Sequence, residues 1–196
     1  MEERSLYTVT ILERTVPMDE FLRDLVDVPR FSGYCQDCPN YGRYWSCPPF
    51  DFAPMALWTG YGAIRLYARK LVFTRDRLFP GERRAFEATE LPKIKGAMAR
   101  ELLAMEAEVP GRLALFPGRC EWCPVCARTE GKPCRMPEKM RYSIEALGGD
   151  CGGALERYLD EKLQWAQGGR LPEQIILLGG LLLPRDAEGE SDDRQV

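Results

Sequence analysis

The chain has 196 residues, of which 45% are hydrophobic, and its formal net charge is −3 at pH 7. This apolar content is enough for a hydrophobic core, so the chain need not depend on cross-links as a very small secreted domain does. It contains eight cysteines and no histidine, which excludes zinc sites of mixed Cys/His type, Rieske centres, histidine-ligated haem, and Ser-His-Asp or Cys-His catalysis.

The N-terminal segment MEERSLYTVT is charged from its second residue and lacks the apolar core of a signal peptide. No stretch approaches the ~20 apolar residues that a membrane-spanning helix needs. We therefore expect a cytoplasmic protein with no membrane partner. In a reducing compartment, clustered cysteines are metal ligands or redox thiols more often than disulfides, although eight thiols would also permit four bridges.

The N-terminal part of the chain predicts a strand, a helix and a longer strand. Apolar residues alternate in LYTVTIL, residues 6–12, as in a short strand. Residues 18–26 have the apolar spacing of a short helix, which Pro29 should stop. AIRLYARKLVF, residues 63–73, alternates again, so we expect a strand with one buried face and with its arginines in solvent.

The clearest helical pattern follows, with apolar residues at steps of four, four, three and four until Pro110-Gly111 ends it. These apolar positions are Ile94, Met98, Leu102, Met105 and Val109. LALF, residues 113–116, then predicts a brief buried strand. Residues 154–166 predict a further helix, with Gly168-Gly169 at its end. The apolar run 175–183 is either a tight hairpin or a central strand with a bulge at Gly179-Gly180.

These elements do not follow the regular βαβ repeat of a doubly wound sheet. We therefore predict an α+β fold, in which a mixed β-sheet is covered by helices and two cysteine-rich loops bind metal. Residues 1–184 should form a single domain. Residues 185–196 are acidic and lack apolar groups, so we expect a disordered tail.

The most informative feature is the second cysteine loop, residues 120–134, which contains Cys120, Cys123, Cys126 and Cys134. So many thiolates gather at one centre only if a soft metal or an iron–sulfur cluster neutralises their charge. Thiolates at positions i, i+3 and i+6 suit three irons of a 4Fe-4S cluster, with a later cysteine on the fourth. Zinc usually takes its ligands from separated pairs. Zinc and a metal-free redox or packing role remain alternatives.

The first cysteine loop, residues 34–50, contains three thiols, those of Cys35, Cys38 and Cys47. Three readings account for the missing fourth ligand. Cys151 supplies it from the GGDCGG turn, two clusters exchange ligands as in two-cluster ferredoxins, or one iron stays open for water or substrate. The chain would thus hold one cluster, or two if this loop also binds one.

Other interpretations of the first loop involve no cluster. The three thiols could hold zinc together with a carboxylate such as Asp37 or Asp51, or they could be free. A small buried side chain explains Cys151 as well as ligation does. The aromatic residues around both loops could shield a metal centre from water or simply pack in the core.

Positive charge is concentrated in two places. Lys and Arg outnumber Asp and Glu between Arg65 and Arg100, and a basic face of this kind steers an acidic redox partner or nucleic acid. A solvated surface explains it more simply. Basic residues also flank the second loop, where they could lower thiol pKa values or guide an anionic partner; they are Arg119, Arg128, Lys132, Arg135 and Lys139.

The segments CPNYGRYWSCPPF and GRCEWCPVCARTEGKPCRMPEKMRYSIEALGGD resemble those of a bacterial and archaeal family of predicted metal-binding proteins, a domain of unknown function. The resemblance extends from about residue 7 to residue 183. It implies a metal-binding role for the seven loop cysteines, and it implies no particular metal or reaction. Those cysteines are Cys35, Cys38, Cys47, Cys120, Cys123, Cys126 and Cys134.

The leading hypothesis is an iron–sulfur protein that transfers electrons to a redox protein partner. The second hypothesis is a zinc-stabilised module that binds another protein or nucleic acid, and we expect nucleic acid less than protein. An enzyme that uses an open cluster iron at the first loop is the third. The sequence contains no phosphate-binding loop and no dinucleotide fingerprint, so we expect no nucleotide site.

Overall fold

A computed structural model of the chain describes residues 6–73, 80–166 and 170–185. The predicted acidic tail lies outside these residues except for its first position. The elements follow one another as β1 (Tyr7–Pro17), α1 (Met18–Leu25), α2 (Val28–Gln36), α3 (Pro54–Trp58), β2 (Ala63–Phe73), α4 (Pro80–Ala85), the π-helix η1 (Phe86–Glu90), α5 (Leu91–Glu108), β3 (Leu113–Leu115), the 3₁₀ turns η2 (Ala127–Glu130) and η3 (Glu145–Leu147), α6 (Cys151–Tyr158) and β4 (Gln174–Leu183).

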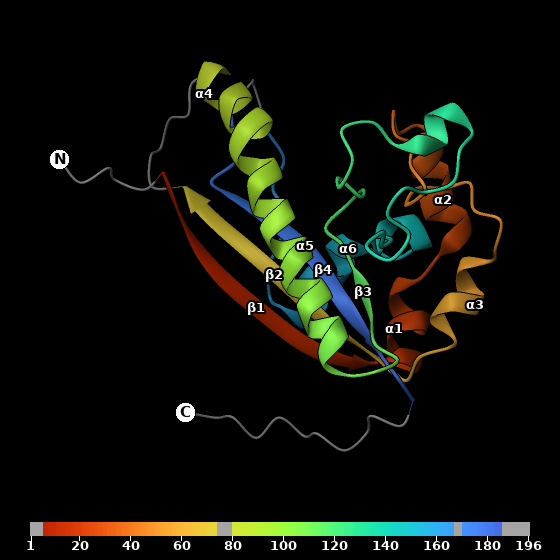
Figure 1. The fold of residues 1–196 in the computed structure, drawn as a ribbon. Coiled ribbons are helices and arrows are strands. Elements are labelled where there is room, and N and C mark those ends of the chain that lie inside the picture. The colour runs from red at the N-terminus through yellow and green to blue at the C-terminus, as the bar shows by residue number, and fades with distance from the viewer. Residues whose placement is uncertain (1–5, 74–79, 167–169, 186–196) are drawn as a thin grey trace.

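The strands form a four-stranded sheet in the order β1-β2-β4-β3 (Figure 1). Each neighbouring pair is antiparallel. The α+β prediction is therefore confirmed, although the described sheet is antiparallel throughout and not mixed. β1 is longer than the predicted strand and pairs with the whole of β2, from Tyr7 opposite Phe73 to Pro17 opposite Ala63.

Helices cover both faces of this sheet. α5 lies across one face (Figure 1), where Met98 and Leu102 pack with Tyr67 of β2. The other face forms a larger core with α1 and α6, and it contains Phe21, Trp58, Ile64, Leu66 and Leu155. The prediction that the arginines of β2 face solvent is wrong for Arg69. Its side chain is only 14% exposed because α5 covers it, and it pairs with Glu101 of that helix.

The run 175–183 is a central strand without a bulge, which decides between the two predicted alternatives. β4 pairs with β2 in continuous register and also pairs with β3. Glycine is needed at position 179 because α5 and β3 approach closely there. A Cβ at this position would lie 2.6 Å from the Leu115 carbonyl oxygen and 2.9 Å from Leu102 Cδ1.

Gly179→Ala should destabilise the sheet, because the backbone of β3 must move to admit the methyl group. Overpacking of this kind costs about 1–3 kcal/mol, measurable by urea unfolding. Gly33→Ala in α2 is the matched control, since a Cβ there meets nothing within 4 Å. Equal stability of the two variants would show that the close approach at position 179 carries no energetic cost.

Three predicted helix boundaries are wrong. The largest error is the end of α6, which stops at Tyr158 and not at residue 166, because the chain turns away at Asp160, whose φ is +51°. Pro29 does not stop a helix but lies in the first turn of α2, whose N-cap residue Asp27 accepts a hydrogen bond from the Arg30 backbone N–H. Cys35 is therefore in the last turn of a helix. α6 begins at Cys151, before the predicted start, because the Asp150 side chain accepts from Gly153 N–H.

A short backbone pairing fixes η3 against the start of α2. The Asp27 N–H donates to the Gly148 carbonyl oxygen at 2.9 Å, and the Asp150 N–H donates to the Leu25 carbonyl oxygen at 2.7 Å. Gly148 has a φ of +91°, and a Cβ there would lie 2.7 Å from Val28 Cα. The turn that carries η3 therefore has a defined position beside α2.

Candidate metal centres

The four thiols of the second cysteine loop line one small cavity. The walls are completed by aromatic and methionine side chains, among them Trp45, Trp122, Met136 and Met140. The thiols themselves are half-buried. The loop starts after β3, where the Phe116 N–H bonds the Tyr142 carbonyl oxygen at 2.8 Å and so closes its base. The predicted ligands therefore surround one space that water reaches only in part.

The electrostatics of Cys120 also indicate a compact group. Burial raises the pKa of its thiol, and the negative charges of Cys134, Cys123 and Cys126 raise it further. These three thiols consequently lie within electrostatic reach of Cys120. A metal centre bound here must displace their protons, because the thiolate is the form that ligates.

The first cysteine loop brings its three thiols into a second group. Burial raises the pKa of Cys47 to about 11, and the charges of Cys38 and Cys35 act in the same direction. A turn joins the first two, because the Cys38 N–H donates to the Cys35 carbonyl oxygen at 3.1 Å. Burial is the main cause that raises the pKa of Cys35. The charges of Cys38 and of the Glu145 carboxylate raise this pKa further.

The two groups are neighbours, although more than seventy residues separate them in the sequence. Ser46 is 1% exposed, and its hydroxyl accepts a hydrogen bond of 2.9 Å from the Cys120 backbone N–H. The same hydroxyl lies 4.0 Å from Cys47 Sγ. One buried side chain therefore connects a predicted ligand of each loop.

Arg128 holds the two loops together. Its guanidinium donates to the backbone carbonyl oxygens of Tyr44, Cys47 and Pro49, all in the first loop. It also lies over the ring of Trp45, 5.1 Å from the centroid, whose indole N–H donates to the Lys132 carbonyl oxygen at 3.0 Å. The contact of the two loops thus depends strongly on one cation.

Three further basic residues that flank the second loop have local partners, among them Lys132, which pairs with Glu130. Arg119 lies 4.4 Å from the ring centroid of Tyr44. It lowers the pKa of Cys47 slightly against the effect of burial. Arg135 donates to the Val125 carbonyl oxygen at 2.7 Å. The effect of Arg119 on Cys47 agrees with the prediction that flanking cations could lower thiol pKa values, whereas the contacts of these cations with the loops were not predicted.

In the part of the chain that the structure describes, the thiols are not bonded to one another and form no preassembled ligand set. Among residues 6–73, 80–166 and 170–185, no three His, Cys, Asp or Glu side chains are arranged to hold a metal ion. All eight cysteines are free, so the alternative of four disulfide bridges is wrong for this structure. The candidate metal ligands in each group are sulfur atoms, and soft ligands of this kind bind iron–sulfur clusters or zinc.

The remaining predicted ligands lie apart from these groups or on the surface. Cys151 is buried in the core with Leu25 and Leu155, and burial raises its pKa well above the ordinary value. Asp37 caps the end of α2 and is exposed, and Asp51 is exposed as well. The positions of these three residues therefore do not single out one of them as the fourth ligand of the first loop.

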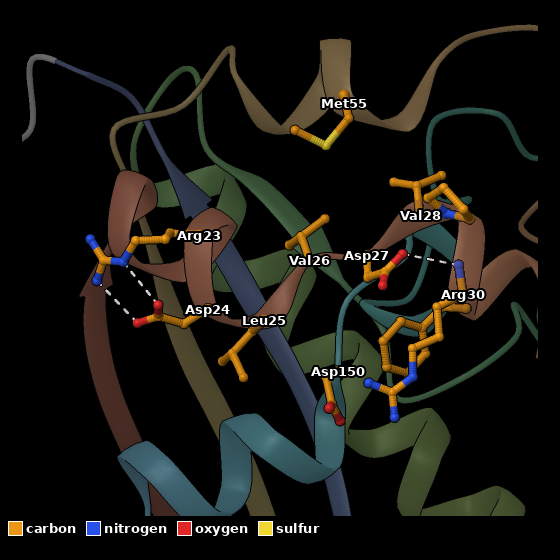
Figure 2. Close-up of a pocket in the computed structure, with 11 residues that line it drawn as sticks. Arg23, Asp24, Leu25, Val26, Asp27, Val28, Arg30, Met55 and Asp150 are labelled. Carbon is orange, nitrogen blue, oxygen red and sulfur yellow. Dashed lines mark hydrogen bonds and ion pairs between the residues drawn. The ribbon is translucent and has the colours of Figure 1, made fainter.

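A cavity of about 440 Å³ lies between α1, α2 and α3 and is lined by no cysteine. Figure 2 shows one ion pair among the side chains that line it and one carboxylate bonded to the backbone. Arg23 pairs with Asp24 at 2.9 Å, and Asp27 accepts from the Arg30 backbone N–H. This cavity is therefore separate from the thiol groups, and its composition does not indicate a metal.

Much of the basic segment that follows residue 65 is neutralised. Within the described part of this segment, Arg65 pairs with Glu13, and Lys95 pairs with Glu121. The other cations in this described part of the segment that pair with a glutamate are Arg69, Lys70, Arg83 and Lys93. Ion pairs of this kind reduce the free positive charge that a polyanion would bind.

Two contributors to the site, Ser46 and Glu145, were not found from the sequence, and Arg128 was singled out only as a charge that flanks the second loop. Ser46 and Arg128 act by connecting two distant loops, and no local pattern reveals such contacts. Glu145 lies in a segment with no strong periodicity.

Among the described helices, none has both the length and the apolar character that crossing a bilayer requires.

Comparison with protein families agrees with the predicted metal-binding character of the chain. A family model described as "Predicted metal-binding protein (DUF2284)" matches residues 22–183, a range that includes both cysteine loops. Neither a curated protein nor a solved structure matches the chain significantly. The family description names no metal and no reaction.

Proposed function

Because the chain belongs to this family of predicted metal-binding proteins, we propose that it is an iron–sulfur protein that transfers electrons to a redox protein partner. The second cysteine loop holds a 4Fe-4S cluster through Cys120, Cys123, Cys126 and Cys134. The first cysteine loop holds a second centre. The proposed setting is the cytoplasm, where thiols remain reduced.

The observation that carries this proposal is that the four thiols of the second loop line one cavity. A single zinc ion binds thiolates at about 2.3 Å, so its four sulfur atoms must meet around one atom. A cubane is wider and needs ligands that surround a space. The spacing of Cys120, Cys123 and Cys126 at i, i+3 and i+6 suits three irons of such a cluster, and this spacing favours the cluster over zinc.

The surroundings of the second loop support electron transfer. When bound, a 4Fe-4S cluster supplies a one-electron redox couple. Trp45 and Trp122 cover the cavity and limit the access of water, which tunes the potential of such centres. In this role one partner protein loses one electron and another gains it, and the chain returns to its starting state.

The contact through Ser46 supports exchange between the two centres. Cys47 and Cys120 belong to different thiol groups and lie on either side of this one side chain. An electron that enters at one loop therefore has a short route to the other. A two-centre carrier of this kind needs no substrate pocket.

Anaerobic purification followed by iron and acid-labile sulfide analysis tests the proposal. We expect a brown protein with a broad absorption band near ~400 nm that fades on reduction with dithionite. A colourless protein loaded with zinc would contradict the iron–sulfur assignment and favour the zinc-stabilised binding module. A protein that holds no metal after reconstitution would contradict both.

A further inference from the structure

We propose that Glu145 is the fourth ligand of the first centre, completing the set begun by Cys35, Cys38 and Cys47. This inference rests on the proposed function, because it concerns the same first cysteine loop. It assigns a carboxylate where the sequence left open Cys151, a carboxylate such as Asp37 or Asp51, ligand exchange between two clusters, an open iron, or free thiols.

The first observation is an unsatisfied oxygen. Oε2 of Glu145 is buried and has no hydrogen-bond partner. A buried carboxylate oxygen without a donor is costly, and native structures rarely retain one without a reason. A metal cation is a partner that would compensate this cost, since carboxylate oxygens bind iron and zinc.

The second observation is position. Glu145 begins η3, which packs against α2, and Cys35 lies in the last turn of that helix. The backbone pairing of Leu25 and Asp27 with the turn at 148–150 holds η3 in place. The carboxylate of Glu145 lies within electrostatic reach of Cys35, and Cys35 lies within reach of Cys38 and Cys47.

The third observation explains Cys151. Its buried thiol forms a hydrogen-bonding interaction with the Glu145 carboxylate. A thiol that donates to the carboxylate orients it and leaves the other oxygen available, in the way that outer-shell partners orient metal ligands. Cys151 is therefore a positioning residue for Glu145 and not itself a ligand.

The competing carboxylates are less suitable. Asp37 and Asp51 are both exposed, so water satisfies their oxygens and no cost remains for a metal to relieve. Of these three carboxylates, Glu145 is the one that combines a buried free oxygen with proximity to a thiol of the first loop. Three thiolates and one carboxylate would form a closed four-ligand set when a bound metal draws these side chains together, since within the described residues they are not preassembled.

The test uses the full chain with Cys120 and Cys123 replaced by serine, so that metal bound after reconstitution belongs to the first centre. Iron and sulfide are added anaerobically, and iron per chain is measured after a challenge with EDTA. Glu145→Gln should lower the retained iron at least tenfold, because the amide keeps the shape but loses the charge. Glu138→Gln, at an exposed glutamate, should retain the iron of the parent.

A second variant separates ligation from folding. Glu145→Cys should restore iron to near the parent level and change the absorption spectrum, because a thiolate replaces the carboxylate. A purely structural carboxylate would not be replaced in this way. Retention of iron and spectrum by Glu145→Gln, or failure of Glu145→Cys to exceed Glu145→Gln, would overturn the inference while the proposed function stands. If the native chain and the serine parent both bind no iron, the proposed function fails and the inference fails with it.

Discussion

Cys123→Ser should remove the centre of the second cysteine loop and leave the first centre filled. The thiol of Cys123 is one of the four that line the cavity, and a serine hydroxyl is a poor ligand for a soft metal. Bound iron should fall by about half when both centres are filled in the native chain. Stability should fall as well, because ligation free energy, about 10–16 kcal/mol in zinc-finger peptides, is also folding free energy.

The matched control is Val125→Ser, in the same loop. Val125 is 56% exposed and contributes no thiol, so this variant should keep its iron, sulfide and unfolding midpoint. Metal analysis and thermal unfolding of the three proteins decide the prediction. Native metal content and native stability in Cys123→Ser would show that this cysteine is not a ligand.

Arg128→Ala should separate the two cysteine loops. Three carbonyl oxygens of the first loop lose their donor at once, and a hydrogen bond from a charged donor contributes about 1.5–3 kcal/mol. Because the group is partly exposed, we expect a total loss of about 3 kcal/mol. Urea unfolding measures this loss, and hydrogen exchange should show faster exchange in residues 34–50 and 120–134.

Arg128→Lys should recover little of this stability, since a single ammonium cannot reproduce the planar donor geometry. Arg43→Ala is the control, because Arg43 lies in the first loop and is exposed. That variant should behave like the native chain. Arg128→Ala with unchanged exchange in both loops would mean that other contacts, such as the one between Trp45 and Lys132, hold them together.

The elements that the sequence predicted best are those with long, regular apolar periods. The bounds of β2 match the predicted strand 63–73, and the helix predicted from Ile94 to Val109 corresponds to most of α5. Both carry enough apolar residues on one face to determine how they pack. The antiparallel order of the strands depends on long-range pairing and has no comparable local signal.

Helix boundaries were predicted wrongly where one residue type can either end or begin a helix. Pro29 stops a helix in one context and starts one in another, and the capping by Asp27 decides in favour of a start. The early start of α6 has the same origin, because Asp150 caps it. A search for N-cap residues before these positions would have found both helices.

The candidate site was only partly accessible from the sequence. Cysteine spacing identified the two sets of thiols, because ligands of one centre are often close in the chain. The contact between the sets depends on Ser46 and Arg128, which join segments far apart in the sequence. Glu145 could be recognised only from its burial and its unsatisfied oxygen, and these are properties of the folded chain.

The central claim is that sulfur donors surround an inorganic cluster in the second cysteine loop. Anomalous diffraction from anaerobically grown crystals, recorded on both sides of the iron absorption edge, tests it most directly. The account predicts a strong iron signal inside the cavity lined by Cys120, Cys123, Cys126 and Cys134. A signal at the zinc edge alone, or no anomalous density between these four sulfur atoms, would contradict it.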